Sequence, residues 1–149
     1  MGKMRLFLTR EFARAARKNF IQNHQLIDAV SRAEQGLIDA DLGAHLIKQR
    51  VGRRGAYRTI IFHKVGERAV FLHLFEKSRQ ANLTPFEEQA YRDLAKVLAG
   101  LEHAAITKLV DTGKWKEIKN EPNEEGVSKR SAPLPSSGRR GSPRRRSDR

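Results

Sequence analysis

Apolar and polar residues recur with a helical period near the N-terminus of the chain. Arg5 to Leu8 predicts a short strand, and Thr9 supplies an N-cap for the helix that follows it. A second helix is expected from about His24, with Gly36 placed to end it. Two sets of apolar residues then face a core from an αα-hairpin: Phe12, Ala15, Ala16 and Phe20, followed by Leu26, Ile27, Val30 and Ala33.

The middle of the chain changes to the period of strands. Three strands are expected within residues 44–51, 56–64 and 68–77, separated by the turn sequences GRRG and VGE. Thr84 and Glu87 then form the capping box of a helix to about Ala99, with Pro85 at its first position. Its inward residues are expected to be Phe86, Ala90, Tyr91, Leu94 and Leu98.

A last short helix ends at Gly113, so the expected order is βααβββαα. This order predicts an α+β fold, with a small, mostly antiparallel sheet, an N-terminal αα-hairpin and C-terminal helices. The folded domain is expected to span residues 1–118. Residues 119–149 hold four of the five Pro and end in clusters of Arg, which is typical of a disordered tail.

Basic side chains gather at one end of the predicted hairpin. If the loop near Val65 has an even number of residues, Arg58 shares a face with His73 and Lys77. That face would also hold Ile60, Phe62, Phe71 and Phe75, and the opposite face Tyr57, Thr59, Ile61, Val70, Leu72 and Leu74. Antiparallel pairing would bring Arg58 beside Lys77 and Arg79.

Four more cations precede Arg58 in the sequence. Lys48 and Arg50 lie two apart and share a face, which is the Arg58 face only if the GRRG turn is odd in length or carries a bulge. Arg53 and Arg54 lie in that turn and are free to reach a ligand. Tyr57, next to Arg58, either packs in the core or stacks on an RNA base.

Charge gives a class of partner. The chain carries 30 Lys and Arg against 17 Asp and Glu, a formal net charge of +13, and about +9 of this lies before residue 121. Such an excess favours a polyanionic partner. There is no Cys, and no P-loop, G-x-S-x-G or H-E-x-x-H motif, so neither a metal, a cofactor nor a small-molecule ligand is expected. No apolar run is long enough for a membrane span, and the cytoplasm is the expected location.

The K-x-R before the turn, the A-Y-R-T-I-I strand and the F-x-K-S-R-x-x-N-L strand end occur in this order. In this respect the chain resembles the RelE/HigB-like toxins of bacterial toxin–antitoxin modules, within the RelE/ParE superfamily. The resemblance extends over about residues 4–118.

The resemblance implies an mRNA interferase, an endoribonuclease that cuts mRNA in the ribosomal A site by attack of the 2′-OH and needs no metal. It also implies growth inhibition held in check by a cognate antitoxin. By resemblance, Arg58 is the phosphate clamp, Lys77 and Arg79 grip the scissile phosphate, and Lys48 or Arg50 acts as base or stabiliser. The Tyr of some family members has no counterpart in ANLTP, where Thr84 is committed to capping, and His73 is the expected substitute.

Other interpretations of the same residues stay open at this point. Arg58 could form a structural ion pair with Glu76 or Asp41, His73 could be a core histidine, and Lys77 and Arg79 could protect a strand end. The whole chain could instead be a ParE-like inhibitor of DNA gyrase on the same fold. It could also be a noncatalytic nucleic-acid-binding module that uses charge alone.

Overall fold

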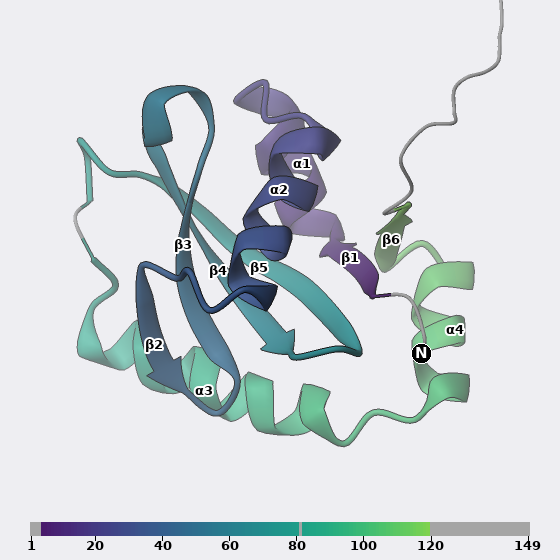
Figure 1. Ribbon diagram of the computed structural model, residues 1–149. Helices are drawn as coiled ribbons and strands as arrows, with labels where there is room; N and C mark the ends of the chain where they lie inside the picture. Colours follow the sequence, from purple (N-terminus) through teal and green to yellow (C-terminus); the bar gives the residue numbers. More distant parts are fainter. Residues whose placement is uncertain (1–3, 81, 120–149) are drawn as a thin grey trace, which may run out of the picture. The chain divides into compact units, whose positions relative to one another are not determined.

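The computed structural model describes residues 4–80 and 82–119. The chain divides into two units, Met1–Lys119 and Asn120–Arg149, and the described residues lie in the first. The tail predicted for residues 119–149 therefore lies outside the described residues, except for Lys119. The helices and strands are β1 (Arg5–Thr9), α1 (Arg10–Lys18), α2 (Asn23–Glu34), β2 (Ala40–Gly43), β3 (Leu46–Val51), β4 (Tyr57–Lys64), β5 (Arg68–Glu76), α3 (Pro85–Ala99), α4 (His103–Asp111) and β6 (Trp115–Ile118), with a 3₁₀ turn at Arg53–Gly55 (Figure 1).

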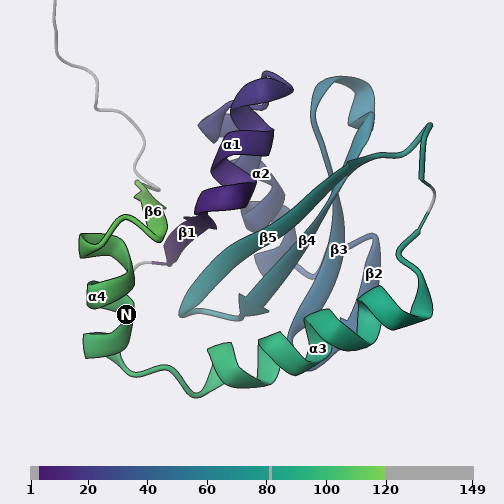
Figure 2. The same ribbon diagram turned by 180° about the vertical axis from the view of Figure 1, so that it is seen from behind.

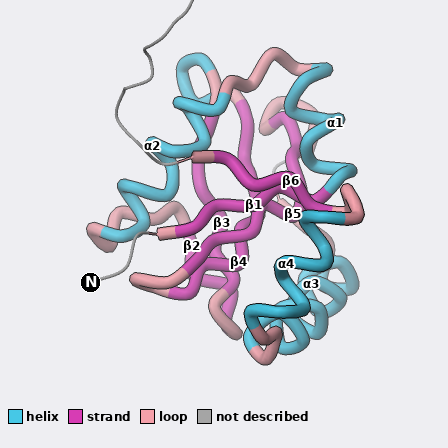
Figure 3. Tube along the Cα trace, turned by 90° about the vertical axis from the view of Figure 1, so that its right-hand side faces the viewer, coloured by secondary structure: helices cyan, strands magenta, loops and turns pink. Residues whose placement is uncertain are grey.

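The strands form one six-stranded sheet in the order β2-β3-β4-β5-β1-β6. Only the β1–β5 pair is parallel, with Arg5 opposite Arg68, and the other four pairs are antiparallel. Helices lie on both sides of this sheet, with α1 and α2 on one side and α3 and α4 on the other (Figure 3). The predicted α+β class with a mostly antiparallel sheet is confirmed.

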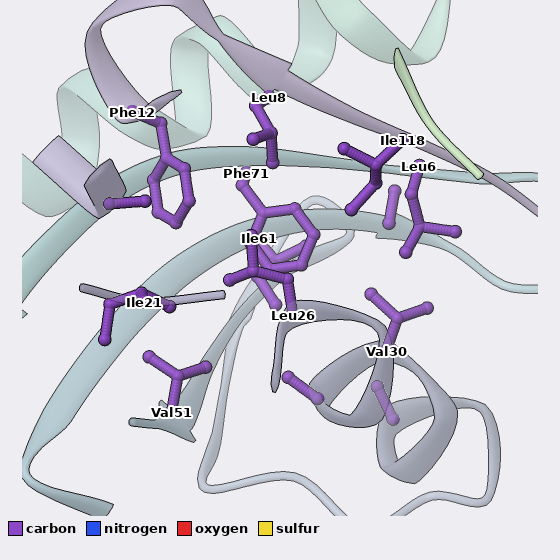
Figure 4. Packing of buried hydrophobic residues seen from close by; sticks show 14 of the residues in the cluster. Leu6, Leu8, Phe12, Ile21, Leu26, Val30, Val51, Ile61, Phe71 and Ile118 are labelled. Carbon is purple, nitrogen blue, oxygen red and sulfur yellow. The ribbon is translucent and has the colours of Figure 1, made fainter. Parts of the chain in front are cut away.

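The αα-hairpin covers one face of the sheet. Phe12 of α1 and Leu26 of α2 are almost completely buried and pack with strand residues such as Ile61 and Phe71, as Figure 4 shows. The predicted cap is present, because the Thr9 side chain accepts a hydrogen bond from Phe12 N at 3.1 Å. Helix α1 nevertheless ends at Lys18, before the last residue predicted to face the core.

The prediction that Phe20 lies in the core is wrong, because Phe20 is 86% exposed. Its φ of +59° is the left-handed conformation that closes a Schellman turn, in which Ile21 N donates to Ala16 O at 2.8 Å. This reversal points the Phe20 ring outward and brings Ile21, 8% exposed, into the core in its place.

Helix α3 crosses the opposite face of the sheet (Figure 2). Its predicted start is confirmed, since Thr84 and Glu87 form a reciprocal capping box with Pro85 at the first helical position. The predicted inward stripe is only partly correct: Leu98 is buried and Tyr91 partly buried, but Phe86 is 83% and Leu94 39% exposed. Ala95 is also buried and takes part in the contact, and its small side chain allows the helix to lie close to the sheet.

Two strands were missed, and both lie at the edges of the sheet. Strand β2 has the sequence ADLG and β6 the sequence WKEI, each of four residues. Four residues show too little alternation of apolar and polar side chains to be recognised as a strand from the sequence alone. They form because β3 and β1 offer unpaired backbone groups beside them.

A bulge in the β4–β5 ladder changes which residues of β5 lie on each face of the sheet. Ile60 lies opposite His73 but Ile61 lies opposite Phe71, so Leu72 is an extra residue. Between Arg58 and the bulge, the residues lie on the faces predicted for them. Beyond it the prediction was wrong, because Phe71 joins the α1–α2 face while Val70 and Leu72 join the α3 face.

Candidate functional site

The β3–β4 hairpin gathers three of the predicted cations on the face covered by α3. Arg50 lies directly opposite Arg58, and Lys48 lies opposite Ile60. The last pair, Val51 and Tyr57, encloses the five residues 52–56, so the turn is odd in length. This meets the condition under which Lys48, Arg50 and Arg58 share one face.

Glycines allow the turn to take this form. Gly52 has a φ of +84°, and a Cβ at this position would lie 3.0 Å from Cδ1 of Tyr57 and 3.1 Å from Cδ1 of Ile21. Gly55 has a φ of +66° and its carbonyl accepts a hydrogen bond from Arg58 Nη1 at 2.8 Å. The turn therefore both packs against the αα-hairpin and holds the guanidinium of Arg58.

A carboxylate that the sequence did not single out lies among the three cations. Asp39 Oδ2 is 3.3 Å from Arg58 Nε and 3.7 Å from Lys48 Nζ, and Asp39 Oδ1 is 3.7 Å from Arg50 Nε. We call Asp39, Lys48, Arg50 and Arg58 the charged cluster. It carries a formal charge of +2, which suits a phosphodiester ligand.

Arg58 is the most deeply placed member of the charged cluster. Its side chain is 7% exposed, against 16% for Lys48 and 63% for Arg50. Its Nη1 donates to the carbonyl oxygens of Gly55 at 2.8 Å and Tyr57 at 3.2 Å. Arg58 therefore does form an ion pair, the structural alternative to a functional role, but its partner is Asp39 and not Glu76 or Asp41.

Lys48 links the charged cluster to the segment before α3. Its Nζ donates to Oδ1 of Asn82 at 2.7 Å, in addition to its contact with Asp39. This segment includes the sequence ANLTP, which contains no Tyr. Thr84 is engaged in capping, as predicted, because its hydroxyl oxygen accepts from Glu87 N at 3.1 Å.

His73 lies on the same face, in a row with Ile60 and Lys48 across three neighbouring strands. Its ring is stacked on Phe75 with centroids 5.8 Å apart and packs against Tyr91 of α3 at 5.6 Å. Burial lowers the pKa of His73, opposed in part by the negative charge of Glu87. The imidazole is therefore neutral near pH 7 and able to accept a proton.

Tyr91, which the sequence predicted only as a core residue, places its phenol ring against His73. Burial, together with Glu87, raises the pKa of Tyr91, so its hydroxyl stays protonated. No pattern in the sequence could have indicated the contact between Tyr91 and His73, because Tyr91 follows the capping box at ordinary helical spacing. Only the packing of α3 on the sheet brings the two rings together.

Lys77 and Arg79 lie just past the end of β5. Lys77 N donates to Ala56 O at 3.0 Å, which places this residue beside the N-terminal end of β4, as antiparallel pairing predicted. Both side chains are exposed, and Arg79 Nε is 3.3 Å from Oε1 of Glu76. They flank the Arg58 end of the hairpin without contacting the Asp39 carboxylate.

The residues expected to bind RNA separate in the structure. Arg53 and Arg54 are exposed at the tip of the turn. Tyr57 faces the other side of the sheet, where its hydroxyl donates to Asn19 Oδ1 at 3.0 Å and its ring packs with the α1–α2 core. The structure therefore places Tyr57 in packing, one of the two roles considered for it.

Two open clefts adjoin the charged cluster. One, of about 530 Å³, lies between α2 and the turn and is lined by Arg32, Arg50 and Arg54 among others. The second, of about 350 Å³, shares Arg32 and Arg50 and includes Asp39. Arg32 was missed because its pair with Asp28, four residues earlier, looks like an ordinary helix-surface pair.

This arrangement can bind a phosphodiester and stabilise charge that develops on it. Within residues 4–80 and 82–119 there is no group of three or more His, Cys, Asp or Glu able to hold a metal ion. In the same residues, no helix is both long and apolar enough to cross a bilayer.

Comparison with known proteins identifies a family. A family model described as the RelE toxin of the RelE/RelB toxin–antitoxin system matches residues 4–118. Searches of curated proteins and of solved structures found no match. The matched range takes in every helix and strand described above and the whole charged cluster.

Proposed function

The chain belongs to the RelE toxin family, the toxin half of a toxin–antitoxin system, and on this premise we propose that it is an mRNA interferase. It acts in the cytoplasm as a metal-independent endoribonuclease that cleaves mRNA in the ribosomal A site. The observation that carries this proposal is the convergence of Lys48, Arg50 and Arg58 on one face of the sheet, within 3.7 Å of a shared carboxylate.

The proposed reaction is attack of an mRNA 2′-oxygen on the adjacent phosphorus, with cleavage of the bond to the 5′-oxygen. Negative charge then increases on the non-bridging oxygens, where fixed cations lower the barrier most effectively. Arg58 and Lys48 supply these cations, and Arg50 holds the phosphate at the surface. His73, neutral because of its lowered pKa, accepts the proton of the 2′-OH.

The surrounding cations are proposed to hold the RNA in place. Arg53 and Arg54 at the turn, Arg32 beside the cleft, and Lys77 with Arg79 at the end of β5 surround the charged cluster. Their contacts with phosphates position the substrate and ribosomal RNA without reading sequence. Tyr57 is not assigned a contact with RNA, because it faces the other side of the sheet.

Membership of the family implies an antitoxin partner. We propose that the cognate antitoxin, encoded beside the toxin, places an acidic segment over the charged cluster or makes the toxin too large for the A site. The net charge of about +9 before residue 121 favours the first arrangement.

The experiment is induction of the wild-type chain, Arg58→Ala and the control Lys96→Ala, at an exposed residue of α3 outside the charged cluster, in bacterial cells, followed within minutes by mapping of mRNA 5′ ends. We expect cuts inside translated codons for the wild type and the control, and none for Arg58→Ala. Growth arrest with DNA damage signalling and no cuts would favour gyrase inhibition instead. Arrest that weakens gradually with the loss of any Lys or Arg would favour a noncatalytic nucleic-acid binder.

A further inference from the structure

Asp39 has a fixed place that the proposed reaction does not explain. Its backbone N–H donates to Lys48 O at 3.1 Å and to Oε1 of the buried Gln49 at 3.2 Å. Gln49 is in turn held by the carbonyl oxygens of Ala29 and Leu37, to which its Nε2 donates at 2.9 and 3.0 Å. The carboxylate is thus carried on a backbone anchored to β3 and α2, and the Asp39 side chain is only 21% exposed.

The guanidinium of Arg58 is hydrogen-bonded through one nitrogen and in ion contact through a second. Nη1 donates to two carbonyl oxygens, whereas Nε is buried without a hydrogen-bond partner and lies 3.3 Å from Asp39 Oδ2, an electrostatic contact. In the part of the chain that the structure describes, Nη2 makes no hydrogen bond and is not among the buried, unpartnered atoms. The Nη2 nitrogen of a fixed guanidinium is therefore left for a ligand, and the charge of Asp39 helps to set its direction.

Charge explains why a carboxylate is needed here. Arg50 and Arg58 are directly opposite each other across two strands, an arrangement that is unfavourable for like charges. Asp39 is in contact with both and with Lys48. It offsets their repulsion before RNA arrives.

The three contacts of Asp39 differ in a way that suits ligand exchange. Lys48 and Arg50 are each 3.7 Å from the carboxylate, and Arg50 is largely exposed, so it can turn toward a phosphate. Lys48 is less exposed, and its Nζ also donates to Asn82 Oδ1 at 2.7 Å. Arg58 is closer and buried, so it stays paired.

We propose that Asp39 is a positioning residue for RNA cleavage, which holds Arg58 in the orientation that meets the scissile phosphate. This inference depends on the proposed function for its activity test. It goes further by giving an acidic residue a part in a site built from cations. In RNA-free protein Asp39 also keeps Lys48 and Arg50 close to the position that the phosphate takes.

The test compares Asp39→Asn with the wild type, with Asp39→Glu and with the matched control Asp41→Asn. Asp41 lies two residues away, is exposed, and accepts only from Gly43 N among the side-chain contacts of the described residues. Cleavage of mRNA on programmed ribosomes gives kcat and KM. Binding of a 2′-O-methyl RNA oligonucleotide, which cannot be cut, is measured at several salt concentrations.

For Asp39→Asn we expect kcat to fall by about tenfold or more while KM stays the same or decreases, because the orientation is lost but positive charge is gained. The salt dependence of oligonucleotide binding should steepen by about 0.7, the value for one further phosphate contact. Asp39→Glu should keep part of kcat, and Asp41→Asn should match the wild type. A merely structural role would lower thermal stability without this separation of kcat from KM.

A double-mutant cycle completes the test. If Asp39 acts through Arg58, adding Asp39→Asn to Arg58→Ala should change the remaining activity by less than about twofold. A further loss that multiplies with that of Arg58→Ala would overturn the proposal, as would a kcat for Asp39→Asn equal to that of the wild type. If Asp39→Asn does not fold, the same cycle with Asp39→Glu decides.

Failure of the proposed function would be recognised separately, because the wild type would then cut no mRNA. The inference is then decided by the Nε–H signal of Arg58 in an NMR spectrum of the free protein. We expect slow exchange with solvent in the wild type and in Asp41→Asn, and fast exchange in Asp39→Asn. Unchanged exchange in Asp39→Asn would show that Asp39 does not hold Arg58.

Discussion

Arg50 and Arg58 face each other across the β3–β4 ladder, and Asp39 contacts Nε of both, at 3.7 and 3.3 Å. Two like charges in directly opposed positions normally destabilise a hairpin. Here the shared carboxylate makes the arrangement tolerable. The two arginines nevertheless differ, because the side chain of one is 63% exposed and that of the other 7%.

This difference predicts different effects of removing each arginine. Arg50→Ala should change the free energy of unfolding by less than about 1 kcal/mol, since an exposed ion pair contributes little. Arg58→Ala should lower it by about 1–3 kcal/mol, since two carbonyl oxygens lose a buried donor and Asp39 loses its nearest cation. Both variants should lose RNA cleavage. Urea unfolding measures the stabilities. An equal loss of stability in the two variants would contradict the difference in burial between Arg50 and Arg58.

The lowered pKa of His73 predicts a dependence of stability on pH. The unfolded chain binds a proton at His73 below about pH 6.5, whereas the folded chain resists it to lower pH because the ring is buried. Stability should therefore fall as the pH drops from about 6.5 toward the lower pKa of the folded protein. His73→Gln should show a weaker decrease over this range, measured as the melting temperature between neutral and mildly acidic pH.

The same group predicts the pH profile of cleavage. If neutral His73 accepts the 2′-OH proton, kcat should rise with pH, and the midpoint of this rise should lie below about pH 6.5. His73→Gln should lower the plateau by about a hundredfold and remove this limb of the profile. An unchanged limb in His73→Gln would assign the base to another residue.

Phe20 offers a stabilising substitution. A bulky residue with a φ of +59° is strained, and its ring, 86% exposed, gains little from packing. Phe20→Gly should therefore raise the free energy of unfolding by about 1 kcal/mol. Phe20→Ala, which keeps the strain and removes the ring, is the control. Equal stabilities of these two variants would show that the backbone conformation is not the cause.

Thr84 is predicted to serve the fold and not the chemistry. Its hydroxyl oxygen accepts from Glu87 N, and Oε1 of Glu87 accepts from Thr84 N at 2.8 Å. Thr84→Ala should cost about 1 kcal/mol of stability and leave kcat unchanged, and Thr84→Ser should restore the stability. A large loss of kcat in Thr84→Ala would give the hydroxyl a catalytic part in place of the absent Tyr.

Local signals were sufficient for much of the fold. The capping residues Thr9 and Thr84 fix the starts of α1 and α3, because a cap is made within one helical turn. The GRRG and VGE turns separate strands whose composition favours extended backbone. The grouping of Lys48, Arg50 and Arg58 needed only one further fact, the odd length of a turn.

Other features depended on partners far away in the sequence. Phe20 left the core because of how α1 ends, and the bulge at Leu72 moved Phe71 to the other face of the sheet. The edge strands β2 and β6 exist only because neighbouring strands offer backbone groups to pair with.

The sequence by itself determined the α+β class, the order of its main elements and the identity of the basic residues, since periodicity, caps and charge are local properties. Only the tertiary structure decided that Asp39 lies among Lys48, Arg50 and Arg58, and that Tyr91 meets His73. A carboxylate 19 residues before Arg58 carries no local sign of its partner. Its position is set by the packing of α2 on β3, through Gln49, and this contact exists only in the folded chain.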